Sequence, residues 1–205
     1  MMKRICLLAL SFVLLLSLCA CDENEKDPVS TAETTVAVTT AATTAATTAA
    51  TTEKSPSVRV PLGYRLYEGE DLCFAYPAHW TQQEGSVVLL MPAGGGNNIT
   101  VAYEPKTDLY RKMTLAQFET IFRPALESMG VHPQNPSVEQ TENEKHIPVT
   151  RISYTTVQSG VEMTQTLLIF DSGDRTYSIT VTVVHLTPDD ALVENVLDTL
   201  TLIKG

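Results

Sequence analysis

Four cysteine thiols are the candidate nucleophiles and attachment points in this 205-residue chain. Cys6, Cys19 and Cys21 lie in or directly after an N-terminal apolar run, and Cys73 stands alone in the rest of the chain. A single cysteine cannot form a disulfide within the part that follows Cys21. The chemistry left for these thiols is nucleophilic attack, metal binding or acylation, and their sequence surroundings distinguish the three.

Cys21 is placed for lipid attachment. Residues 5–20 are mostly apolar, follow a basic start, and end in Leu18-Cys19-Ala20-Cys21. A membrane-spanning helix needs about 20 apolar residues, so this run is too short for a permanent span and is typical of an export signal. Its end resembles the lipobox of bacterial lipoprotein signal peptides, in which an aliphatic and two small residues precede the acylated cysteine. We expect a signal peptide over residues 1–20 and a lipid on Cys21; the alternative is an ordinary cleaved signal.

Cys73 lies in the strand-like sequence Leu72-Cys73-Phe74-Ala75-Tyr76. It has no basic neighbour in sequence that would stabilise a thiolate. Buried cysteines usually behave as small, unreactive hydrophobic residues. We interpret Cys73 as part of the core rather than as a reactive thiol.

Four histidines could act as general bases or metal ligands: His79, His132, His146 and His185. They are scattered along the chain, and none forms a pair with a metal-ligand spacing such as H-x-x-x-H. The sequence therefore predicts no metal and no cofactor, and a site built from these side chains would have to be assembled by the fold.

Other chemistry-bearing patterns are incomplete. Residues 94–96 are Gly-Gly-Gly, but no helix and no Lys-Ser/Thr pair follow, as a phosphate-binding loop requires, so they predict a hairpin loop. Ser86 and Ser159 lack the G-x-S-x-G context of a serine nucleophile. Asp171 and Asp174 flank a turn without the longer acidic ladder of a calcium loop. The sequence predicts no catalytic residue.

The charge of the chain excludes one class of partner. Its formal net charge is −10, and residues 58–205 hold ten Lys or Arg against eighteen Asp or Glu. An acidic surface repels nucleic-acid backbones and anionic lipid surfaces. We expect no nucleic-acid partner, a membrane link only through the lipid on Cys21, and a monomer.

Residues 21–57 form a tether between the lipid and a domain over residues 58–205. Residues 31–52 hold eleven Thr and eight Ala, with a repeated Thr-Thr-Ala-Ala pattern and no apolar face. Such a segment buries too little apolar surface to offset the entropy of ordering. We expect disorder, either as a bare spacer or as a stalk with O-linked sugars.

Seven apolar or alternating runs in the domain predict β-strands. They cover residues 64–67, 72–76, 86–91, 99–103, 149–157, 161–169 and 177–183. Turn sequences at residues 158–160 and 171–174 make the last three an antiparallel meander. Residues near Pro133 and Pro136 predict a loop.

Two stretches predict amphipathic helices. Thr114 and Gln117 match a capping box, Gly130 provides a stop, and Pro124 should bend the helix over residues 115–128. Leu115, Phe118, Phe122 and Met129 are expected on its buried face. The second helix follows Thr187 and Pro188, with a buried stripe of Leu192, Val196, Leu200 and Ile203. Two helices on an antiparallel sheet predict an α+β domain.

One motif resembles a known family. The sequence Phe74-Ala75-Tyr76-Pro77-Ala78-His79-Trp80 is similar to the F-x-Y-P-x-x-W start of PsbP-like domains, which include DcrB-like lipoproteins and Mog-type proteins. The closing Leu197, Thr199 and Leu200 fit the same pattern. The resemblance covers about residues 64–203 and implies an α/β/α-type sandwich with a central antiparallel sheet, in which Trp80 fills the core.

Two functional hypotheses remain. The first is a non-catalytic binding or accessory module, held by its lipid at the extracytoplasmic face of a bacterial membrane, with a protein or cell-wall partner. The second is an envelope enzyme whose active site is assembled from residues distant in sequence. Fold alone does not decide between them. A pocket with convergent histidines or perturbed carboxylates would favour the enzyme, and an exposed aromatic surface would favour the binding module.

Overall fold

The computed structural model describes residues 58–108, 110–186, 189 and 191–203. The expected signal peptide, Cys21, the tether, Thr187 and Pro188 lie outside the described residues, so the predictions made for them are not tested by the structure.

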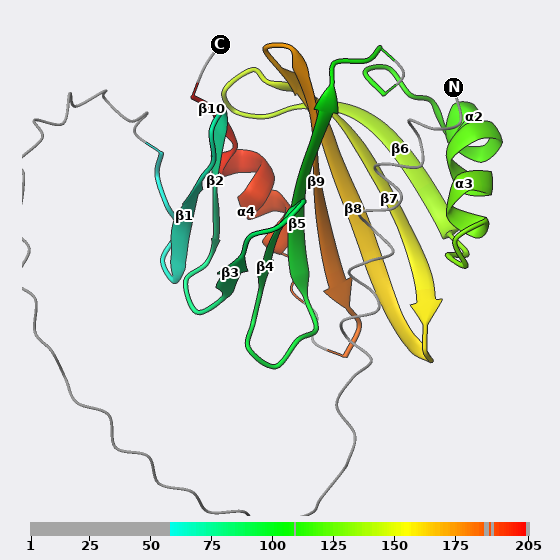
Figure 1. Cartoon of the computed structure of the whole chain (residues 1–205), viewed down its shortest axis with the longest axis horizontal. Helices are drawn as coiled ribbons and strands as arrows, with labels where there is room; N and C mark the ends of the chain where they lie inside the picture. Colours follow the sequence, from blue (N-terminus) through cyan, green and yellow to red (C-terminus); the bar gives the residue numbers. More distant parts are fainter. Residues whose placement is uncertain (1–57, 109, 187–188, 190, 204–205) are drawn as a thin grey trace, which may run out of the picture.

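Seven antiparallel strands form a large sheet in the order β3-β4-β5-β9-β8-β7-β6 (Figure 1). The strands are β3 (Thr81–Gln83), β4 (Val88–Met91), β5 (Asn98–Pro105), β6 (Gln134–Glu142), β7 (Pro148–Gln158), β8 (Val161–Ser172) and β9 (Arg175–Val184). The predicted meander of the last three strands is confirmed. Ser159 and Gly160 between β7 and β8 have φ values of 50° and 79°, as a tight two-residue hairpin turn requires.

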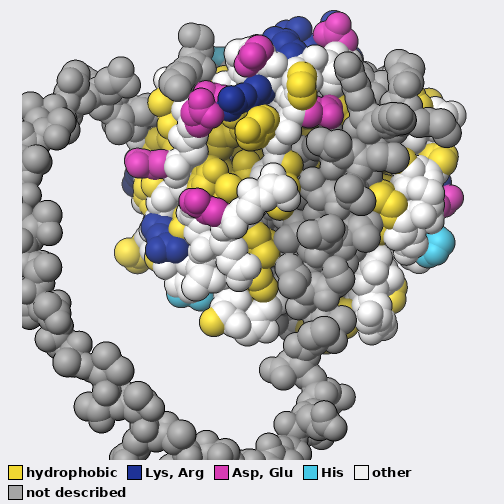
Figure 2. Space-filling model, in the orientation of Figure 1, with side chains coloured by type: hydrophobic (Ala, Val, Ile, Leu, Met, Phe, Trp, Pro, Cys, Tyr) yellow, Lys and Arg dark blue, Asp and Glu magenta, His cyan; other side chains and the backbone are white. Residues whose placement is uncertain are grey.

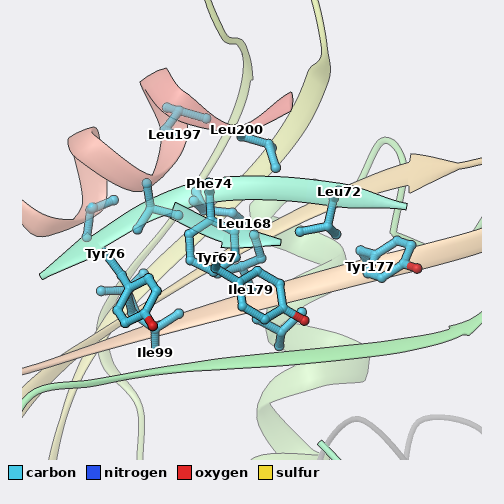
Figure 3. Packing of buried hydrophobic residues seen from close by; sticks show 14 of the residues in the cluster. Tyr67, Leu72, Phe74, Tyr76, Ile99, Leu168, Tyr177, Ile179, Leu197 and Leu200 are labelled. Atoms are coloured by element: carbon cyan, nitrogen blue, oxygen red, sulfur yellow. The ribbon is translucent and has the colours of Figure 1, made fainter. Parts of the chain in front are cut away.

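A second layer covers one face of this sheet. It consists of a three-stranded sheet, β1 (Tyr64–Glu68), β2 (Leu72–Pro77) and β10 (Thr201–Leu202), together with helix α4 (Leu192–Thr199). In Figure 3, Phe74 of β2 lies between Leu197 and Leu200 of the α4 segment and Leu168 and Ile179 of the large sheet. All five side chains are buried in one hydrophobic cluster.

Helical turns cover the opposite face. Helix α2 (Leu115–Gln117), a π-helical turn (Phe118–Phe122) and helix α3 (Arg123–Glu127) bury Phe118, Phe122 and Leu126 against strands β7 and β8. Neighbouring residues of a strand point to opposite faces. Leu167 and Leu168 accordingly belong to different hydrophobic clusters, one on each face. The predicted α+β class, with a central antiparallel sheet and two helical segments, is confirmed.

The first helix is irregular where Pro124 predicts a bend. Thr114 and Gln117 form the predicted capping box, and the Arg123 N–H donates to the carbonyl of Phe118, five residues earlier. This wider turn lets the chain continue through a proline that has no N–H to donate. The prediction that Leu115 is buried was wrong. Its side chain is exposed, whereas Met113, just before the helix, is buried in the same cluster as Phe118.

The predicted loop near Pro133 and Pro136 was also wrong, because most of it is strand β6. This strand lies at the edge of the large sheet, and its register with β7 is irregular between Gln134 and Ser137. A proline is tolerated at an edge or a bulge, where its missing N–H breaks no ladder bond.

The last helix is shorter than predicted. Leu200 has extended backbone at the end of α4, the chain then pairs with β2 as β10, and Ile203 is exposed rather than part of a buried stripe. Among the described residues, no helix is long and apolar enough to cross a membrane.

Candidate functional site

The four histidines lie at the ends of different elements. His79 follows β2, His132 precedes β6, His146 lies in the turn between β6 and β7, and His185 follows β9; all four are exposed. In the described part of the chain, no group of three His, Cys, Asp or Glu side chains could hold a metal ion.

His146 Nδ1 lies beside the carboxylate of Glu142, and His185 lies beside both a carboxylate and a hydroxyl. The Nδ1 of His185 lies 3.2 Å from Glu162 Oε2, and its Nε2 lies 3.0 Å from Thr164 Oγ1. Acid, imidazole and hydroxyl follow in the order that hydrolases use to activate a nucleophile. The side chains of His185 and Glu162 are 42% and 56% exposed, so water screens their interaction. The arrangement borders a polar groove of about 480 Å³ beside α4.

Cys73 and Trp80 are core residues, as predicted. Cys73 is 1% exposed and Trp80 is 4% exposed. Burial raises the pKa of the Cys73 thiol, so it stays protonated and unreactive. Neither side chain is part of a candidate site.

A different site is formed where the two sheets separate. Figure 2 shows a hydrophobic hollow in the upper left of the view, between the positions of β2 and β5 in Figure 1, with charged side chains at its rim. The hollow has a volume of about 150 Å³. Its lining includes Tyr67, Leu72, Val88, Val101, Tyr103 and Tyr177, with Glu70 and Arg175 at the rim. We call this hollow the tyrosine pocket.

The local sequence explains how Tyr67 reaches the pocket. Tyr67 is followed by the turn between β1 and β2, in which the Gly69 N–H donates to the carbonyl of Leu72 over 2.9 Å. A Cβ atom on Gly69 would lie 3.0 Å from the hydroxyl of Tyr67. A Cβ atom at the turn would require the Tyr67 ring to shift by a few tenths of an ångström, so glycine lets the ring pack closely against the turn.

Arg175 forms the polar rim of the tyrosine pocket. Its Nη1 donates to Glu70 Oε2 over 2.9 Å and to Asp71 Oδ2 over 3.0 Å. Its guanidinium lies 4.5 Å from the centre of the Tyr103 ring, within the range of a cation–π interaction. These contacts hold the guanidinium in one orientation beside an aromatic ring whose residue is 55% exposed.

Tyr177 connects the rim to the pocket wall. Its hydroxyl donates to Asp71 Oδ2 over 2.7 Å, and its ring lies 5.5 Å from that of Tyr103. Burial, together with this hydrogen bond to a carboxylate, raises the pKa of Tyr177 to about 12 against the opposing effect of Arg175. The phenol is therefore neutral at physiological pH and acts as a donor.

The sequence alone did not predict this site. Arg175 is 105 residues from Glu70 and 104 from Asp71, and nothing in the local pattern around either segment points to the other. The only local signal is Arg175, a charged residue at the start of β9, whose other side chains are apolar or carry a hydroxyl group. The aromatic and ionic groups of the tyrosine pocket are arranged to contact a ligand in the hollow.

Comparison with known proteins identifies the fold. The solution structure of CyanoP, the cyanobacterial PsbP of Synechocystis sp. PCC 6803, is similar with a TM-score of 0.54 and 13% identity. The match covers 68% of this chain and 92% of CyanoP. This similarity confirms the PsbP-like fold implied by the motif ending at Trp80.

Two further structures are more distant. LpqN, involved in cell envelope biogenesis of Mycobacterium tuberculosis, matches with a TM-score of 0.36 and 15% identity over 68% of this chain and 90% of LpqN. A Bacteroides thetaiotaomicron protein matches with a TM-score of 0.44 and 16% identity over 65% of this chain. This chain covers 45% of that protein's length. No protein-family model and no curated protein sequence matches the chain.

Proposed function

We propose that this protein is a lipid-anchored, extracytoplasmic binding module of the bacterial cell envelope, without catalytic activity, and that the tyrosine pocket binds a protein partner. The observation that carries the proposal is an open hydrophobic hollow with an exposed tyrosine and a fixed arginine at its rim. Aromatic residues and arginine dominate the binding energy of protein interfaces. The lipobox-like sequence that ends at Cys21 and the Thr/Ala-rich segment after it support this location.

The size of the pocket defines what it accepts. A hollow of about 150 Å³, with aromatic and aliphatic side chains as well as polar groups in its lining, has the volume for one benzene-sized ring. We infer that one aromatic or branched aliphatic side chain of the partner enters the pocket, while Tyr103 and Arg175 contact its neighbours. The acidic surface of the domain favours a partner whose contacting surface is not strongly acidic.

Removing the exposed ring of Tyr103 tests whether the tyrosine pocket binds a partner. A photo-crosslinking amino acid at Ser86, an exposed residue of the pocket lining, should give a discrete higher-mass adduct in cells. Tyr103→Ala should reduce its yield about tenfold or more, because truncating an interface aromatic typically removes ~2 kcal/mol of binding energy. Leu115→Ala, which truncates another exposed hydrophobic residue on α2, is the matched control and should leave the yield unchanged.

The alternative function is an envelope hydrolase that uses Glu162, His185 and Thr164 beside the polar groove. It would show as turnover of ester or peptidoglycan substrates that disappears in His185→Ala at an unchanged melting temperature. That result would contradict the binding module. So would the absence of any adduct at Ser86, or an equal loss of adduct in Leu115→Ala.

The anchor is tested separately. Cys21→Ser removes the thiol that accepts the lipid, and we expect the protein to leave the membrane fraction or to remain unprocessed. Detergent phase separation measures the outcome. A Cys21→Ser protein that partitions like the wild type would overturn the anchor, while Cys19→Ser, two residues earlier, should partition like the wild type.

A further inference from the structure

A small cluster of charges lies apart from the tyrosine pocket and shares no lining residue with it. Lys106, Arg111 and Asp171 line a hollow of about 200 Å³ at the edge of the sheet where β8 ends and β9 begins. Its other walls are Pro148, Thr150, Ile169, Phe170 and Thr176. The proposed binding function of the tyrosine pocket does not involve these groups.

One oxygen of Asp171 is left without a hydrogen bond. Its Oδ1 accepts a hydrogen bond from Thr176 Oγ1 over 2.8 Å. Its Oδ2 is buried and, within the described residues, has no hydrogen-bond partner. Lys106 Nζ and Arg111 Nε lie 3.5 and 3.8 Å from it, close enough for attraction but too far for a hydrogen bond. Buried acceptors in proteins are almost always paired, so this oxygen is placed to accept a bond from a ligand.

The charges of the cluster do not balance. Among the described residues that line the hollow, two cations face one carboxylate, an excess of one positive charge within a domain that is acidic as a whole. A ligand that completes the site must donate to Asp171 Oδ2 and must also carry a negative group for Lys106 and Arg111. Charge-assisted hydrogen bonds of both signs would then be formed in one hollow.

We propose that this hollow binds a small free α-amino acid as its zwitterion. The ligand's ammonium group donates to Asp171 Oδ2, and its carboxylate accepts from Lys106 and Arg111. Both cations lie within 4 Å of the same oxygen, so the ammonium and carboxylate groups of the ligand must lie close together, as they do when both are bonded to the α-carbon of an amino acid. A peptide separates its terminal charges by at least one further residue, about 3.3–3.6 Å of chain.

The walls of the hollow determine which side chain the bound amino acid can carry. Ile169 and Phe170 are 2% and 3% exposed and present apolar surface, and Pro148 adds a third apolar group. A volume of about 200 Å³ corresponds to roughly six to seven water molecules at roughly 30 Å³ each, enough for a small amino acid. The apolar walls favour a ligand with a small apolar side chain, or none, over one with a charged side chain.

Glycine and two fragments that each carry one of its charges, acetate and methylammonium, test the proposal. The purified whole protein is titrated with glycine, acetate or methylammonium, and binding is followed by backbone amide shifts and calorimetry. Glycine should saturate the site and shift the amides around Asp171 and Thr176. Each half-molecule satisfies one charge and meets a like charge, so it should bind about tenfold more weakly or worse. Acetate or methylammonium binding as well as glycine would overturn the proposal, and so would no binding of glycine.

Two variants locate the site. Asp171→Asn keeps an oxygen for Thr176 but can place an amide donor where the ammonium must bind, so glycine affinity should fall about tenfold or more. Asp174→Asn makes the same change three residues away in the turn and should alter affinity less than about twofold. Arg111→Gln, at a side chain 57% exposed, should weaken glycine without affecting folding. Equal losses in Asp171→Asn and Asp174→Asn, or none in Arg111→Gln, would contradict the site.

Discussion

Trp80→Ala should destabilise the domain by about 3–5 kcal/mol, the usual effect of truncating a buried aromatic side chain. Trp80 is 4% exposed and belongs to the hydrophobic cluster that joins β2, α4 and the large sheet. The backbone also fixes it, because its N–H donates to the carbonyl of Pro77 over 3.1 Å. Domains are stable by only about 5–15 kcal/mol, so this variant should be close to unfolding at physiological temperature.

Fluorescence and denaturation measure this prediction. Trp80 is the only tryptophan in the chain, so the wild-type emission reports on this position alone. We expect blue-shifted emission that iodide quenches poorly. Trp80→Phe keeps an aromatic ring in the cluster and should lose less stability than Trp80→Ala. Red-shifted, fully quenched emission, or a loss below about 1 kcal/mol in Trp80→Ala, would show that the residue is not a core anchor.

Local signals in the sequence predicted local structure well. The capping box at Thr114 and Gln117 is formed, and Gly130, with φ of 78°, ends the first helical segment. The N–H of Val131 donates back to the carbonyl of Leu126, the Schellman pattern that such a glycine permits. These features depend on residues within about five positions of one another, which is why one sequence was sufficient to predict them.

Features that depend on distant partners were missed. Strand β6 contains Pro136, which reads locally as a strand breaker, yet pairing with β7 along the sheet edge outweighs that preference. Strand β10 is only two residues long and exists because β2 offers a free edge beside Cys73. Tertiary pairing decided both elements.

The candidate sites were not predictable for the same reason. In the tyrosine pocket, Arg175 meets Glu70 and Asp71 across more than 100 residues. Asp171 was recognised as a turn residue in the sequence, but its cationic neighbours Lys106 and Arg111 come from the segment after β5. A charge's role depends on which side chains the topology places around it, and spacing along one strand does not contain that information.

Asn143 makes contacts that only the fold reveals, and both the Nδ2 and the Oδ1 of its side chain are hydrogen-bonded. It is 5% exposed and lies in the turn between β6 and β7. Its Nδ2 donates to the carbonyls of Leu197 and Leu200 over 3.2 and 2.8 Å, and its Oδ1 accepts from the N–H groups of Lys145 and Ile147 over 3.0 Å each. One side chain therefore satisfies carbonyls at the end of α4 and closes a turn more than 50 residues earlier.

Asn143→Ala should lose about 3–5 kcal/mol, because each buried polar group left without a partner costs about 1–3 kcal/mol. Asn143→Asp keeps the size and the two accepted bonds but places a carboxylate against two carbonyl oxygens. Burial and that repulsion raise its pKa in the folded state above the unfolded value. The folded state then favours the protonated form, so the penalty is full at neutral pH and shrinks as the pH falls through the folded pKa. Urea denaturation at pH 7 and pH 4 measures both variants, with Gln83→Ala, an exposed side-chain amide on β3, as the control. If Asn143→Asp were as stable as the wild type at pH 7, the side chain would not be the tie between the turn and α4.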